Sequence, residues 1–357
     1  TIFAGGGDGS LVVFSGSGKS YTSQQKKTLV GGINSISLSS DGVEMLAGTS
    51  EGNIYRLRTK KLDKLLMAEN HAGRIVAIGY QKGVSDKFAT IGEDNVIRYW
   101  DVSDYSAVSK AYIQKKSKPM CLTFISDIIV TGWRDGSVMA HDSENGDELW
   151  SINSADRSGV SSLAVSSNQK FIVTGGLEGS VKVWAVRSRQ LISHFKEHTG
   201  AVTSIQVFDD DTHIITSSRD RSAYIWDLRR ERRIGGHTCK MGSINKMRLC
   251  SDQTQFLSVG QDKRITYWDL RQSQPTRIVE YSNSEEALAF DISHDNKFYA
   301  AAGTDQIVKL YSFESGRCLS TGIGHSGKVL DLSFSADDKQ LVSVGNDGCI
   351  FVWNVYS

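Results

Sequence analysis

One short pattern of apolar and polar residues recurs along the chain and is clearest between Gln255 and Arg271. Phe256–Val259 is an apolar run, Gly260–Asp262 is a polar turn, and Ile265–Trp268 is a second apolar run. Two β-branched or aromatic runs joined by a few polar residues predict a β-hairpin. The acid in the turn lies six residues before the final aromatic residue, which gives a register for comparing the rest of the chain.

The same offset of six residues returns at intervals of 41–43 residues through most of the sequence. The pairs are Asp94/Trp100, Asp135/His141, Glu178/Trp184, Asp220/Trp226, Asp262/Trp268, Asp305/Tyr311 and Asp347/Trp353, with an earlier pair at Asp8/Phe14. Glu51 and Tyr55 are only four residues apart, which predicts a degenerate repeat. A period of about 40–45 residues is typical of a propeller blade built from four strands.

Three of these units contain the dipeptide Trp-Asp, at Trp100-Asp101, Trp226-Asp227 and Trp268-Asp269. On these residues and their spacing, the chain resembles the WD-repeat family over nearly its whole length. The resemblance implies an all-β fold, a WD-repeat β-propeller of four-stranded blades.

The two ends of the repeat region suggest how the ring closes. The last unit ends at Trp353–Val355 without a fourth strand, whereas Leu62–Met67 is a predicted strand with no complete repeat before it. Pairing it with Ile350–Val355 would give a seven-bladed ring over residues 62–357, closed by strand exchange, and would remove an open sheet edge. Residues 1–61 would then be the remnant of a preceding propeller or an extra blade. The alternative is a ring of eight blades, closed by a strand near Tyr21–Leu29.

Composition argues against several functional classes. The 357 residues are 39% hydrophobic and 23% charged, which predicts a soluble globular chain. A net charge of +1 argues against nucleic-acid binding by counterion release. No apolar run approaches the roughly 18 residues of a membrane span. The five cysteines contain no Cys-x-x-Cys pair, which favours reduced thiols in a cytosolic compartment.

Four units share a set of polar residues: a His before the first strand, a Ser or Thr in the second, the turn acid, and the Trp. The sets are His71, Thr90, Asp94 and Trp100; His198, Thr216, Asp220 and Trp226; His237, Ser258, Asp262 and Trp268; and His325, Ser343, Asp347 and Trp353. Together Asp, His and Ser suggest a hydrolase. A catalytic triad occurs once, however, and this set occurs four times. We therefore expect a structural hydrogen-bond chain, with no catalytic residue, metal or cofactor, and looser blades where the set is incomplete.

Two surfaces are candidates for binding a partner. The residues just before the turn acids should ring one face: Glu93, Arg134, Leu177, Arg219, Gln261, Thr304 and Asn346. Trp133, beside Arg134, is either an interface anchor or a residue packed against the next blade. Arg229, Arg230, Arg232 and Arg233 follow Trp226 and would suit an acidic partner such as the surface of a microtubule, although such runs are usually only solvated.

Four segments narrow the resemblance: Gly31–Ile36, Gly48–Arg56, Ile152–Val160 and Gly324–Gly327. They are similar to ciliary and flagellar WD-repeat proteins with tandem seven-bladed propellers, which lie inside axonemal doublet microtubules. The resemblance implies a cytoplasmic, non-enzymatic scaffold of the axonemal cytoskeleton that contacts tubulin and neighbouring proteins and has no small-molecule substrate.

A competing hypothesis is a cytosolic adaptor. Trp226-Asp227-Leu228-Arg229 and Trp268-Asp269-Leu270-Arg271 match the short Trp-Asp-x-Arg motif of cullin–RING ligase substrate receptors.

Overall fold

The computed structural model describes residues 1–17, 20–68, 70–103, 106–282 and 284–356. Within them, the chain forms 34 strands in antiparallel sheets and no helix, which confirms the predicted all-β class. The chain divides into two compact units, Thr1–Ala72 and Gly73–Ser357.

The first unit contains two antiparallel sheets that share one apolar core. Leu11 and Val13 of one sheet pack with Met45, Ala47 and Leu57 of the other. The sheets are β1 (Ile2–Gly5), β2 (Ser10–Ser17) and β3 (Ser20–Thr28), then β4 (Ile33–Leu38), β5 (Glu44–Thr49), β6 (Ile54–Arg58) and β7 (Lys64–Ala68).

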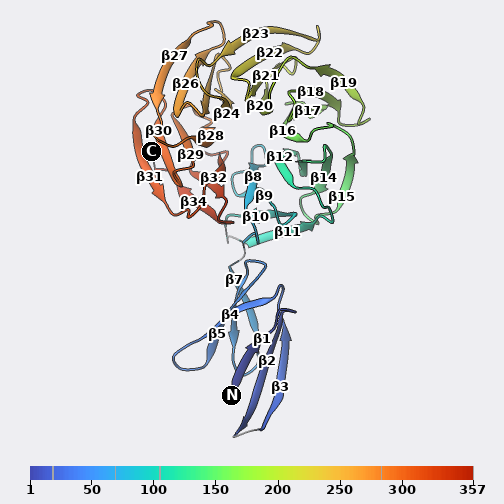
Figure 1. Ribbon diagram of the computed structural model, residues 1–357, viewed down its shortest axis with the longest axis vertical. Coiled ribbons are helices and arrows are strands. Elements are labelled where there is room, and N and C mark those ends of the chain that lie inside the picture. The colour runs from blue at the N-terminus through green and yellow to red at the C-terminus, as the bar shows by residue number, and fades with distance from the viewer. Residues whose placement is uncertain (18–19, 69, 104–105, 283, 357) are drawn as a thin grey trace. The chain divides into compact units, whose positions relative to one another are not determined.

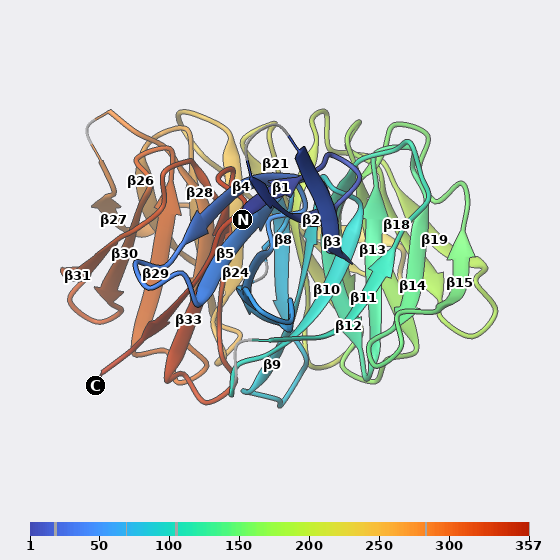
Figure 2. The ribbon, with the colours of Figure 1, turned by 90° about the horizontal axis from the view of Figure 1, so that it is seen from below.

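The second unit contains seven sheets, arranged around a ring in Figure 1 and seen edge-on in Figure 2. In chain order they are β8 (Ile75–Tyr80), β9 (Lys87–Gly92), β10 (Val96–Asp101) and β11 (Ser106–Tyr112); β12 (Pro119–Ile125), β13 (Ile128–Trp133), β14 (Val138–Asp142) and β15 (Glu148–Ile152); β16 (Val160–Val165), β17 (Phe171–Gly176), β18 (Val181–Ala185) and β19 (Leu191–Phe195); β20 (Val202–Val207), β21 (His213–Ser218), β22 (Ser222–Asp227) and β23 (Arg232–Thr238); β24 (Ile244–Leu249), β25 (Gln255–Gly260), β26 (Arg264–Asp269) and β27 (Pro275–Glu280); β28 (Ala287–Ile292), β29 (Phe298–Gly303), β30 (Ile307–Ser312) and β31 (Cys318–Ile323); and β32 (Val329–Phe334), β33 (Gln340–Gly345) and β34 (Ile350–Asn354).

The core lies between neighbouring sheets. Ile215 and Ile225 of one sheet pack against Met247, Phe256 and Trp268 of the next. The inner strands are buried on both faces, as in β17 and β25, because each sheet is covered by a neighbour on either side. This explains why they read as continuous apolar runs rather than as alternating patterns.

The predicted strand exchange is not found. β7 pairs with β6, with Tyr55 opposite Leu66, while β34 pairs with β33 and with no other strand among the described residues. The β6–β7 turn is short and local, with Leu62 N donating to Arg58 O at 2.8 Å. Closing so short a loop costs less chain entropy than pairing strands almost 300 residues apart.

The first and last sheets of the ring meet by side-chain packing instead. Ile75, Ile78 and Trp100 of the first sheet form one apolar cluster with Val342 and Val344 of the last. The junction between these two sheets therefore has a packed core, although the last sheet has three described strands and each of the others has four.

The antiparallel order gives the ring two faces. We call the upper face the one that carries the turns between second and third strands, such as Gly260–Asp262, together with the loops between sheets. We call the lower face the one that carries the turns between first and second strands, and between third and fourth. The first strands surround a central cavity of about 600 Å³, which Lys246 of β24 and Asp331 of β32 bridge at 3.0 Å.

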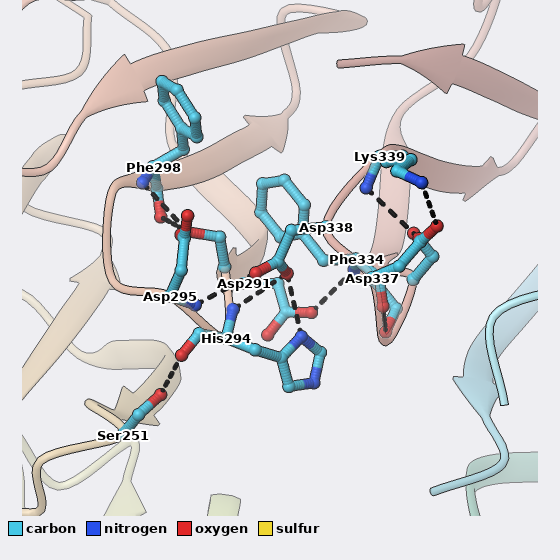
Figure 3. Close-up of polar contacts among 12 residues, drawn as sticks. Ser251, Asp291, His294, Asp295, Phe298, Phe334, Asp337, Asp338 and Lys339 are labelled. Carbon is cyan, nitrogen blue, oxygen red and sulfur yellow. Dashed lines mark hydrogen bonds and ion pairs between the residues drawn. The ribbon is translucent and has the colours of Figure 1, made fainter. Parts of the chain in front are cut away.

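On the lower face, one turn residue of each of several sheets caps the turn of the preceding sheet. Asp211, Gln253, Asn296 and Asp338 all have φ between 53° and 58°, and each accepts at least one backbone N–H from the preceding sheet. In Figure 3, Asp338 accepts from the amides of His294 and Asp295 at 2.8 and 2.9 Å, and Ser251 Oγ donates to the carbonyl of His294. The equivalent position in the first sheet is Gly83, φ 78°, which has no side chain to act as a cap.

We predict that Asp338→Gly lowers the free energy of unfolding by about 0.5–1.5 kcal/mol, because it removes the charged acceptor of two exposed amides of the preceding turn. Glycine tolerates the left-handed backbone, so this substitution tests the cap rather than backbone strain. Chemical denaturation measures the effect. Lys339→Ala, next to it and 80% exposed, should be neutral. Equal stability of both variants would contradict the cap.

Candidate functional site

Two of the four predicted polar sets form complete hydrogen-bond chains. His198 lies 2.9 Å from Asp220 through Nδ1 and 2.8 Å from Thr216 through Nε2, and Trp226 Nε1 donates to Thr216 at 2.8 Å. A carboxylate only accepts, so Nδ1 carries the proton and Nε2 accepts from the hydroxyl. His325, Asp347, Ser343 and Trp353 repeat this geometry, with distances of 2.8–2.9 Å.

The hydrogen bonds set the ionisation of these acids. Burial alone would raise the pKa of Asp220, but hydrogen bonds from His198, Ser222 and Thr199 outweigh it and hold that pKa well below the usual value. Asp347 follows the same balance, so its pKa is also lowered. Both carboxylates are therefore stable anions inside the fold, each in contact with an imidazole Nδ1.

The first set lies partly in each unit. His71 belongs to the first unit, whereas the other three residues belong to the second. Trp100 Nε1 donates to Thr90 at 2.7 Å, as in the complete sets. The Asp94 carboxylate forms an ion pair with Arg98 at 2.8 Å, in which the arginine side chain is 3% exposed.

The third set is not brought together. His237 lies within β23, opposite Ala223, and packs edge-on against Phe256 and Trp268. Its Nδ1 is buried and has no partner among the described residues. Trp268 Nε1 still donates to Ser258 at 2.9 Å.

The sequence contained the signal for this difference. His198 and His325 precede their acids by 22 residues, whereas His237 precedes Asp262 by 25, so the four sets did not share one register. As a result the Asp262 carboxylate accepts from the amide of Arg264, at 3.3 Å, and from no other residue in the described part of the chain. Burial raises its pKa, and this hydrogen bond offsets the effect only in part.

The three sheets that depart from the set have other bases beside their acids. Lys115 lies 2.8 Å from Asp135, and Lys309 lies 2.7 Å from Asp305. In the β16–β19 sheet, Asp156 takes the acidic role: it pairs with Lys182 at 3.2 Å and accepts from Ser180. We call the histidine of a complete set, His198 or His325, its brace histidine. Asp156 stands 22 residues before Glu178, the same spacing that separates a brace histidine from its acid, so the spacing could have identified it.

Trp133 is a core residue and is not available as an exposed anchor. Its side chain has no exposed surface and packs between two sheets with Ile91, Tyr99 and Ile129. Trp133 Nε1 donates to Thr131 at 3.0 Å. Because His141 stands where other units have tryptophan, Trp133 supplies the missing indole from the end of the adjacent strand. The prediction that it packs against a neighbouring sheet is therefore the better one, although that sheet is the preceding one, β8–β11, and not the next.

The predicted face of turn residues is largely exposed. Arg134, Arg219, Gln261 and Asn346 have solvent-exposed side chains on the upper face. Glu93 is half-buried and paired with Arg74 at 2.8 Å and with Lys118 at 3.1 Å. Glu93 is therefore held by ion pairs within the fold and is less available to a partner than the other four residues.

The arginine run lies in the β22–β23 turn on the lower face. Arg229, Arg230 and Arg232 are exposed, while Arg233 pairs with Glu197 at 3.2 Å and lies over the ring of Tyr224. Asp227 accepts the backbone amides of Arg229 and Arg230 at 2.9 and 3.0 Å, which fixes the turn.

Arginines occupy the same register in the neighbouring sheets. Arg187 follows Trp184 by three residues, as Arg229 follows Trp226 and Arg271 follows Trp268. All three side chains are exposed, and none forms an ion pair within the described part of the chain. We call these three residues the arginine arc.

Among the described residues, no group of three or more His, Cys, Asp or Glu side chains is placed to hold a metal ion. The five cysteines are all free thiols. The described part of the chain also contains no helix that is long and apolar enough to span a membrane.

Neutralising the two kinds of acid should have different effects on the stability of the fold. We predict that Asp220→Asn destabilises the protein by about 1.5–3 kcal/mol at pH 7, because it removes a charged hydrogen bond. Asp262→Asn should cost nothing, because the ionised form of Asp262 is disfavoured by burial.

The dependence on pH has a definite sign. A lowered folded pKa stabilises above the unfolded value of about 3.9, so the difference between wild type and Asp220→Asn should shrink as the pH falls through that range. Melting temperatures of both variants between pH 3 and 7 measure this. Equal losses of stability for Asp220→Asn and Asp262→Asn at pH 7 would contradict the assignment of Asp220 as the acid whose ionised form stabilises the fold.

The comparisons with known proteins agree with this architecture. The family model described as WD domain, G-beta repeat matches residues 316–354, and one described as Vps8 beta-propeller matches residues 102–251. Cilia- and flagella-associated protein 52 of Mus musculus is 32% identical over 97% of this chain, and that of Homo sapiens is 31% identical over 99%. The protein of that name in Chlamydomonas reinhardtii is 29% identical over 99% of this chain.

The chain covers 57% of the length of each of these three relatives. The repeated strands, the indole–hydroxyl bonds and these similarities agree with one another. The chain is a WD-repeat protein with a β-propeller fold, similar over nearly its whole length to cilia- and flagella-associated protein 52.

Proposed function

We propose that this chain is a non-enzymatic interaction scaffold of cilia or flagella, which contacts tubulin and neighbouring proteins inside axonemal microtubules. The single observation that carries the proposal is the similarity to cilia- and flagella-associated protein 52 over 97–99% of the chain. The repetition of the polar sets supports a structural use of Asp, His and Ser, because their groups are mutually bonded and buried within the sheets.

The domain organisation belongs to the same proposal. The second unit would be one complete seven-bladed propeller, supported by the packing of its first sheet against its last. The first unit would be the remnant of a preceding propeller. Leu46 of β5 and Ile54 of β6 support this, since they are 47% and 42% exposed on the side of the sheet away from the shared core.

The arginine arc is the surface best suited to an acidic partner. It extends over three consecutive sheets, so it presents charge along a line rather than at one point. The β14–β15 turn of the preceding sheet is acidic instead, with Asp142, Glu144, Asp147 and Glu148. The basic region therefore has a defined boundary, which gives orientation as well as attraction to a charged partner.

Localisation tests the proposal directly. A fluorescently tagged full-length protein, expressed in ciliated cells, should concentrate along the axoneme and resist detergent extraction. Absence from cilia would overturn the proposal, and co-purification with a cullin–RING ligase adaptor would favour the adaptor instead.

Charge reversal tests the arginine arc. We predict that the triple variant Arg187→Glu, Arg229→Glu and Arg271→Glu weakens co-sedimentation with microtubules at least tenfold, and that salt weakens wild-type binding in the same assay. The matched control reverses three exposed cations of the upper face, Arg134, Arg219 and Lys328, for the same change in net charge. Loss of binding only in the control would assign the contact to the upper face.

A further inference from the structure

The turn acid Asp262 has no base beside it among the described residues, unlike most turn acids of the ring. Three turn acids form ion pairs, Asp94–Arg98, Asp135–Lys115 and Asp305–Lys309, and two contact a histidine Nδ1, Asp220–His198 and Asp347–His325, all at 2.7–2.9 Å. In the β16–β19 sheet the pair Asp156–Lys182, at 3.2 Å, replaces one at the exposed turn acid Glu178. In the β24–β27 sheet, Asp262 forms no ion pair with any described residue. Position 266, four residues beyond this acid, is a threonine, where the corresponding position holds Arg98 or Lys309 in two of the other sheets.

A lysine and a cysteine lie where the histidine would be expected. Lys240, which is exposed, precedes Asp262 by 22 residues, the offset of His198 and His325 from their acids. Cys239 precedes Asp262 by 23 residues, the offset that separates His71 from Asp94. Its thiol is buried, and burial raises its pKa to about 12. Cys239 packs in one apolar cluster with Trp268, whose indole donates to Ser258. A thiol is much shorter than an imidazole, so it leaves the space towards the carboxylate unfilled.

That space is a cavity of about 160 Å³. Asp262, Cys239, Thr266 and Trp268 line it, which are the residues that would surround a brace histidine in this sheet. In the complete sets the histidine ring fills the equivalent position, and aromatic side chains cover it: Tyr224 stacks on His198 at 4.5 Å. Here no ring of the described chain occupies the position between the acid and the indole.

The rim of the cavity is open and partly apolar. Met241 and Ile278, both of which line it, are 68% and 50% exposed. Lys240 and Arg264 also border it and are exposed. Two exposed large apolar side chains beside a polar cavity suit a protein segment that inserts one side chain and packs its flanks on the rim.

We propose that the cavity beside Asp262 binds the imidazole ring of a histidine side chain from a partner protein. The ring would take the place that His198 and His325 occupy in their own sheets. One N–H would donate to Asp262, and the other nitrogen would face Cys239 and Ser258. A neutral imidazole fits better than a cation, because Lys240 and Arg264 flank the opening with positive charge. That a partner protein supplies the histidine rests on the proposed scaffold function. The binding of imidazole in the cavity beside Asp262 does not depend on that function.

The test uses free imidazole at pH 8, where the ring is neutral, and the full chain labelled at methionine methyl groups. Imidazole should shift the Met241 methyl resonance in a saturable way and raise the melting temperature. The variant Cys239→His supplies its own ring, so it should melt at a higher temperature and bind imidazole at least tenfold more weakly. Asp262→Asn keeps the cavity but removes the carboxylate, and should also weaken binding at least tenfold.

Gln261→Ala, on the adjacent exposed position, is the matched control and should bind imidazole as wild type does. A Met241 resonance that does not respond to imidazole, or unchanged binding in Asp262→Asn, would overturn the proposal even if Cys239→His did not fold. Tighter binding of methylguanidine than of imidazole would assign the cavity to arginine and overturn the histidine. Because the assay needs no ciliary partner, its outcome is independent of localisation.

Discussion

The structure depends on the packing of sheets that cannot bury both of their faces alone. Each inner strand of the second unit, such as β17 or β25, is apolar on both sides, so it is stable only between two neighbours. Ile75 and Trp100 of the first sheet also pack with Val342 and Val344 of the last, so these two sheets cover one another as neighbouring sheets do elsewhere in the unit.

A second requirement follows from burying polar side chains between sheets. The turn acids, Ser or Thr hydroxyls and indoles lie at sheet boundaries, where an unsatisfied group would cost about 1–3 kcal/mol. The chain meets this requirement with histidine in two sheets, and with lysine or arginine in four others. The position needs a nitrogen donor beside a carboxylate, and several residue types can provide one. In the β24–β27 sheet the acid Asp262 has no such base among the described residues, and in the β16–β19 sheet Asp156 takes the place of the exposed Glu178.

Particular residues show where inference from sequence succeeded and failed. The spacing of acid and aromatic residues found seven units, because each sheet imposes the same turn and the same buried strand on its sequence. The His237 set is not formed although its residue types match, because His237 lies three residues further from its acid than His198 and His325 do. A shift of three residues reverses the side of a strand, and it places His237 within β23 rather than in the loop. Trp133 was ambiguous for a related reason: a tryptophan beside a turn is exposed or buried according to the neighbouring sheet, which the local sequence does not describe.

The sequence by itself determined the all-β class, the repeat, the position of each hairpin turn and the partners of most indoles, since these depend on residues within about 40 positions of one another. Tertiary structure decided the features that depend on competition between distant segments. It paired β7 with β6, where a short turn outweighs a long-range exchange, and it buried Trp133 between two sheets. It also decided what surrounds Asp262, because a carboxylate without its base becomes visible only when the cavity beside it is known.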